Sequence, residues 1–151
     1  MMRKFIPIIL VLFGLAAGVG AGAFLRPAPE VTEEKEAETL APAHPPDYVK
    51  INNQFVVPVV EGGRVSAMVI LSLSLEVTQG STEAIYAKEP KLRDGFLQVL
   101  FDHANAGGFR GTFTDGANLV ILRSALLEAA QKVMGNIVSD VLIVDIARQD
   151  G

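Results

Sequence analysis

The segment V-S-A-M-V-I-L-S-L-S-L-E-V (residues 65–77) contains the clearest strand pattern in this 151-residue chain. Every second residue is apolar. Serine or glutamate holds most of the positions between, whereas Met68 and Ile70 make two of these positions apolar as well. Such alternation predicts a β-strand that buries one face. The apolar residues of that face are Val65, Ala67, Val69, Leu71, Leu73, Leu75 and Val77.

The residues before this strand predict its hairpin partner. Glu61-Gly62-Gly63-Arg64 is typical of a tight hairpin turn. Two earlier segments, residues 48–51 and 54–57, are strand-like, and we expect Pro58 to break the strand there. Proline within a strand pattern also favours an edge position, because it donates no hydrogen bond.

Three helices are expected after the strand. Ser81 is placed to cap a short helix that reaches Glu89, and Pro90 then suits the first turn of a second helix. The second helix ends near Gly107-Gly108 and places one set of residues on a single face: Leu92, Phe96, Val99, Leu100 and His103. The third runs from Asn118 to Gly135, with Leu119, Leu122, Leu126, Ala130 and Val133 on one side.

The last element is residues 138–149, which are β-branched and almost continuously apolar in the middle. This pattern predicts a strand covered on both faces. The order of elements is thus β-β-α-α-α-β, which indicates an α+β domain (residues 48–151) with a small sheet packed against about three helices.

The N-terminus predicts a transmembrane helix over residues 5–25, which carry no charge. Twenty-one helical residues extend about 31 Å, close to the thickness of the hydrocarbon core. Arg3 and Lys4 precede the span, and only Arg26 follows it directly, so residues 1–4 are predicted to be a cytoplasmic tail. A cleaved signal peptide is the alternative, with small residues at 21–23, but the apolar run is longer than a signal peptide requires.

Three glycines of the predicted span, Gly14, Gly18 and Gly22, recur every four residues. They share one helix face and would allow another membrane helix to approach closely. Glycine is also simply common in membrane helices, so the spacing alone leaves this second explanation open.

Residues 26–47 predict an acidic, proline-rich linker. Six of the seventeen acidic residues and five of the eight prolines lie there, so we expect a solvated spacer. The domain that follows carries nine basic and eleven acidic residues without a basic patch, which argues against nucleic-acid binding. The chain has no cysteine, which excludes disulfides and thiolate chemistry.

No catalytic, cofactor or metal site is expected. Asp102 and His103 are adjacent on a helix and would point about 100° apart. His44 and His103 are the only histidines and make no ligand cluster. The glycines between residues 107 and 116 lack the spacing of a phosphate-binding loop.

Three charged residues are candidates for an interface with another subunit or with a partner. Arg93 and Asp94 lie at the start of the second predicted helix, where they form either a surface pair or an interface pair. Arg123 interrupts an otherwise apolar helix, where an arginine either extends along the surface or contacts a subunit.

The layout and three segments resemble the flagellar basal-body protein FliL family. The segments are S-L-S-L-E-V (residues 72–77), E-P-K-L-R-D-G-F (89–96) and G-N-I-V-S-D-V-L-I-V-D-I-A-R-Q (135–149). Residues 101–118 depart from the family pattern, which leaves the helix boundary there undetermined.

The resemblance implies a non-enzymatic, periplasmic domain similar in fold to stomatin/SPFH domains. It further implies a protein of the inner membrane that assembles as a homo-oligomeric ring around the flagellar stator and supports motility. Two alternatives stay open from the residues themselves: an envelope-anchored sensing module unrelated to flagella, and an envelope hydrolase that uses His103.

Overall fold

The computed structural model describes residues 44–151. The predicted tail, the predicted span with Gly14, Gly18 and Gly22, and the linker up to residue 43 lie outside these residues. Within residues 44–151, no helix has the length and apolar character needed to cross a membrane.

The described residues form four strands and three helices, which confirms the predicted α+β class. The strands are β1 (Asp47–Lys50), β2 (Phe55–Glu61), β3 (Arg64–Val77) and β4 (Val138–Asp150). The helices are α2 (Thr82–Ala87), α3 (Glu89–Asn105) and α4 (Gly116–Met134), followed by one 3-10 turn, η2 (Gly135–Ile137).

Strand β3 is the centre of an antiparallel sheet. Residues 67–71 of β3 pair with both β2 and β4, and residues 74–77 pair with both β1 and β4. Because a strand has only two edges, β4 fills one edge of β3 while β1 and β2 share the other. The predicted hairpin between β2 and β3 is confirmed: Glu61 pairs with Arg64, and Gly62 and Gly63 both have positive φ angles, as this turn requires.

The prediction that Pro58 breaks the first strand is wrong. Pro58 lies inside β2, opposite Met68, and the chain instead turns before β2, where Asn53 has a φ of 59°. Strand β2 tolerates a proline because it lies at the edge of the sheet, where no further strand needs the N–H that Pro58 lacks. The predicted edge position itself is confirmed.

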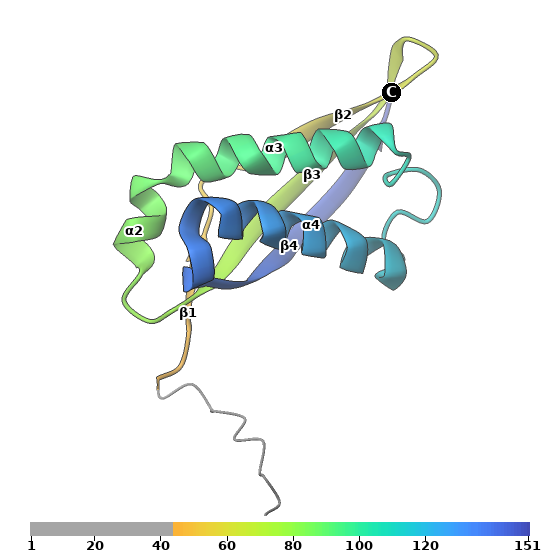
Figure 1. The fold of residues 1–151 in the computed structure, drawn as a ribbon. Coiled ribbons are helices and arrows are strands. Elements are labelled where there is room, and N and C mark those ends of the chain that lie inside the picture. Colours follow the sequence, from red (N-terminus) through yellow and green to blue (C-terminus); the bar gives the residue numbers. More distant parts are fainter. Residues whose placement is uncertain (1–43) are drawn as a thin grey trace, which may run out of the picture. The chain divides into compact units, whose positions relative to one another are not determined.

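Helices α3 and α4 cover one face of the sheet, and the core lies between the two layers (Figure 1). The odd-numbered residues of β3 from Ala67 to Val77 are buried there, as predicted. Val65 is the exception at 56% exposed, beyond a shift in register between β2 and β3. The predicted helix faces are also confirmed, because the buried residues include Leu92, Phe96, Leu100, Leu122, Leu126 and Ala130.

The prediction that the last strand is covered on both faces is wrong. In β4 only Val138 and Val141 are buried, and Val144 is 58% exposed. The helices cover only one face of the sheet, so the apolar residues of β4 that point the other way have no covering layer within residues 44–151 (Figure 1).

Helix α2 follows Ser81 as predicted but ends at Ala87, short of the predicted Glu89, and two details of the helix starts differ from the prediction. Ser81 precedes α2, but its hydroxyl makes no capping hydrogen bond, because its backbone (φ −94°, ψ 3°) lies outside the extended region that capping needs. Helix α4 begins at Gly116, two residues before Asn118, since the Asp115 carboxylate accepts a hydrogen bond from the Ala117 N–H. Gly135, at φ 65°, ends α4 as predicted.

Candidate functional site

Arg93, one of the predicted interface residues, binds the loop between β1 and β2. Its Nη1 donates to the carbonyl of Asn52 at 2.9 Å, and its Nη2 donates to the carbonyl of Gln54 at 2.8 Å. The guanidinium carbon also lies 4.3 Å from the centre of the Phe55 ring, a cation–π distance. Arg93 therefore fastens this loop to α3, while Asp94 beside it is exposed.

Arg123, the third predicted interface residue, lies half-buried on α4. Its Nε is buried and has no hydrogen-bond partner within residues 44–151. A buried donor without an acceptor costs free energy, so this position of Arg123 is an unfavourable one that the packing of α4 tolerates. The neighbouring Val120 and Ile121 are 57% and 64% exposed, which is unusual for two large apolar residues in sequence.

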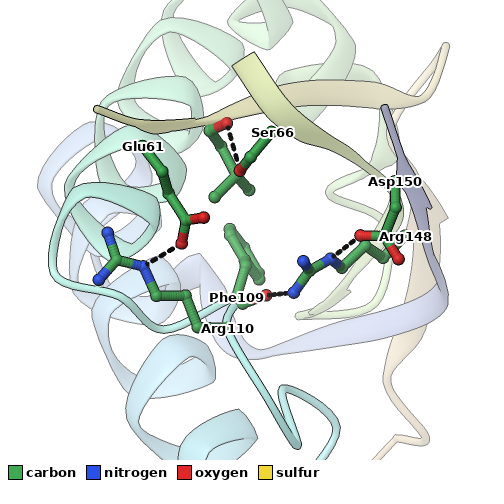
Figure 2. A network of polar contacts seen from close by, with 7 residues as sticks. Glu61, Ser66, Phe109, Arg110, Arg148 and Asp150 are labelled. Atoms are coloured by element: carbon green, nitrogen blue, oxygen red, sulfur yellow. Dashed lines mark hydrogen bonds and ion pairs between the residues drawn. The ribbon is translucent and has the colours of Figure 1, made fainter. Parts of the chain in front are cut away.

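A polar network joins the α3–α4 loop to the far end of the sheet (Figure 2). Arg110 of the loop pairs with Glu61 of the hairpin, with Nε and Oε1 2.8 Å apart. Arg148 of β4 donates from Nη1 to the carbonyl of Phe109 at 2.7 Å and pairs through Nε with Asp150. The hydrogen bond from Arg148 to Phe109 is better shielded from solvent than the pair of Arg110 and Glu61, because the Arg148 side chain is only 22% exposed.

Sequence reasoning missed the residue that organises this loop. The amide Nδ2 of Asn118 donates to the carbonyls of Gly108 (2.7 Å) and Phe113 (2.8 Å), which closes the loop over the start of α4. The available signal was an asparagine just inside a helix after a glycine-rich run, but that pattern is equally typical of a simple cap.

Asp102 and His103 do not form an acid–base pair. Asp102 accepts a hydrogen bond from Gln98, whereas His103 turns toward the loop and packs edge-on against Phe109, with ring centres 4.9 Å apart. The Nε2 of His103 is buried and has no partner within the described part of the chain. The geometry gives His103 a packing role.

Burial lowers the pKa of His103, and a backbone hydrogen bond with Gly108 opposes this effect only in part. The unfolded chain therefore binds a proton more readily than the folded domain. We expect the contribution of His103 to stability to be complete above about pH 6.5 and to be lost progressively as the pH falls below that value. Urea unfolding of residues 44–151 at pH 8 and at lower pH, compared with His103→Gln, measures this. An equal pH dependence in both proteins would contradict it.

A shallow depression of about 370 Å³ lies at the end of β3, where Glu76 meets Ser139. The carboxylate of Glu76 is already engaged, because it accepts hydrogen bonds from Tyr48 at 3.1 Å and from Ser139 at 2.7 Å. The bond to Glu76 in turn raises the pKa of Tyr48. Among residues 44–151, no three histidine or acidic side chains gather closely enough to hold a metal ion.

Comparison with known proteins agrees with this description. The family described as flagellar basal body-associated protein FliL matches residues 48–149, which is more than half of the chain and nearly all of the described domain. A search of the curated proteins gives no match. The residues matched include the central strand β3, all three helices and β4 up to Gln149. This chain belongs to the FliL family of flagellar basal body-associated proteins.

Proposed function

We propose that this protein is a non-enzymatic scaffold of the flagellar motor. It is anchored in the inner membrane by residues 5–25, with residues 1–4 in the cytoplasm and residues 48–151 in the periplasm. The domain has a stomatin/SPFH-like fold, and copies assemble into a ring around the stator and support it during motility. The observation that carries the proposal is the family match over residues 48–149.

The proposal assigns roles to two sets of residues. Gly14, Gly18 and Gly22 form the face through which the membrane helix packs against a neighbour, because small residues allow close approach in the bilayer. Of the three candidate interface residues, Arg123 is half-buried on α4, three residues after the exposed Val120. Arg93 contributes by holding the β1–β2 loop in place, and Asp94 is exposed for contact.

Deleting the gene and restoring it from a plasmid tests the proposed function. We expect the deletion strain to recruit less fluorescently labelled stator to its motors and to swim and swarm more slowly. The full chain should restore both properties, whereas residues 1–43 alone, which retain the span and most of the linker, should restore neither. Unchanged motility and stator recruitment in the deletion strain would refute the proposal, and would favour an envelope protein unrelated to flagella.

A further inference from the structure

The loop between α3 and α4 (residues 106–115) carries one buried side chain, that of Phe109. The ring of Phe109 packs edge-on against the imidazole of His103, in the last turn of α3, with ring centres 4.9 Å apart. Gly108 lies so close to the same imidazole that a Cβ atom on it would overlap the ring. Phe109 and Gly108 therefore cover the His103 ring, and the loop cannot lift without uncovering it.

Few other contacts hold the loop closed. The side-chain amide of Asn118 donates to two loop carbonyls, and Arg148 donates to the carbonyl of Phe109 (Figure 2). The ion pair of Arg110 with Glu61 is largely exposed on both sides, so it adds little. The closed position of the loop thus depends on these hydrogen bonds and on the packing of Phe109.

The loop can move without the two long helices. Gly107 and Gly111, at φ angles of 86° and 56°, lie on either side of Phe109 in a conformation that glycine enters readily. The helices are held by buried residues outside the loop, among them Leu92, Phe96, Leu100, Leu122 and Leu126. Movement of Phe109 about the two glycines would leave this core in place.

The closed loop favours a neutral imidazole at His103. An imidazolium carries an N–H at both nitrogens, but Nε2 is buried and has no partner within the described residues. Burial lowers the pKa of His103, and this effect outweighs the backbone hydrogen bond with Gly108. An open loop would admit water to the ring, so the charged form of His103 favours the open loop.

The charged side chains on the elements around His103 are already engaged within residues 44–151. They bind a neighbouring amide or form an ion pair: Asp102, Asp115, Arg110 with Glu61, and Arg148 with Asp150. The causes of the lowered pKa of His103 are burial and the Gly108 bond, and these charges are not among them. A proton on His103 therefore gains no stabilising carboxylate from the described part of the chain.

We propose that the α3–α4 loop is an acid-sensitive element, in which protonation of His103 displaces Phe109 and opens residues 106–115 while the helices and the sheet stay folded. This inference goes beyond the loss of overall stability expected at low pH, because it confines the change to one loop. It does not depend on the proposed motor role. The open loop exposes the Phe109 ring and frees Arg148, which changes the surface at this end of the domain.

Amide hydrogen exchange of the full-length protein in detergent micelles, followed by mass spectrometry, tests the opening. Gly108 and Arg110 are suitable reporters, because their amides are bonded to His103 and Gly107 in the closed loop. Rates corrected for the intrinsic effect of pH give protection factors. From pH 8 to pH 5 we expect those of the loop to fall at least about threefold, and those of residues 119–130 to change little. An equal fall in both segments would indicate general unfolding and would overturn the inference.

His103→Gln is the matched variant, because glutamine stays uncharged at both pH values. Its loop protection factors should be the same at pH 8 and at pH 5. A fall as large as in the unaltered protein would show that another group controls the loop, and would overturn the inference.

The reverse coupling gives a second test that leaves His103 in place. Asn118→Ala removes two hydrogen bonds that close the loop, so the pKa of His103 should rise toward its usual value. NMR titration of the histidine ring measures this, with His44→Gln in the background so that one histidine remains. Ser124→Ala, at an exposed position further along α4, is the control and should leave that pKa unchanged. The same pKa with and without Asn118→Ala would show that the loop and His103 are not coupled.

Discussion

Replacing Phe55 with alanine is expected to lower the free energy of unfolding by about 3–5 kcal/mol. Phe55 is fully buried at the start of β2, and its ring meets Phe96 of α3 edge-on with centres 6.1 Å apart. The same ring lies under the guanidinium of Arg93, which holds the β1–β2 loop. The substitution thus leaves a cavity between sheet and helix and removes an aromatic pair and a cation–π contact.

Urea unfolding of residues 44–151, followed by far-ultraviolet circular dichroism, measures this loss. The fragment is suitable because the whole described core lies within it. Val56→Ala is the matched control: the residue is next in the same strand, but it is 49% exposed on the uncovered face. Its cost should stay within about 1 kcal/mol. Equal losses for the two variants would contradict the role of Phe55.

Replacing Gly108 with valine is the second large effect, with an expected cost of about 1–3 kcal/mol. A Cβ atom built on Gly108 would overlap the imidazole of His103, with Nε2 as its nearest atom. The ring has little freedom to move, because it packs against Phe109 and its Nε2 is buried. Gly108 does not have a positive φ, so the penalty is steric and not conformational.

A second substitution separates steric overlap from other effects. In the Gly108→Val, His103→Ala double variant, the ring that meets the new side chain is gone, so we expect much of the lost stability to return. Gly116→Ala is the control, since a Cβ atom there would meet nothing within 4 Å. Both are measured by thermal unfolding. Purely additive losses in the double variant would show that His103 is not what opposes a side chain at position 108.

Local patterns predicted the central part of the fold well. The alternation in residues 65–77 indicated which face of β3 is buried, and Gly62-Gly63 indicated the hairpin, because both signals act between near neighbours. Pro58 and β4 were misread for a shared reason. Whether a strand has a neighbour on each edge, or a layer on each face, depends on distant segments that periodicity does not contain.

The candidate site shows the same limit. Arg93 and Asp94 are adjacent in sequence and were predicted as one pair, yet Arg93 turns to carbonyls about forty residues earlier in the chain. Arg123 was correctly singled out as unusual, but only the fold reveals that its Nε is buried without an acceptor within residues 44–151. The exposure of Val144 was missed, since the apolar run of β4 is equally typical of a core strand.

The position of β3 at the centre of the sheet also governs how the domain is made. Its pairing with β4 joins Val77 to Val138 and Ala67 to Asp150. This edge of β3 therefore stays unpaired until β4, which follows both long helices in the chain, has been synthesised. Pairings so distant in sequence form slowly, and until then an apolar strand edge is open to other chains. Newly made protein is therefore most prone to aggregate before its last strand is in place, and loss of that strand by premature termination would leave this vulnerable state permanent.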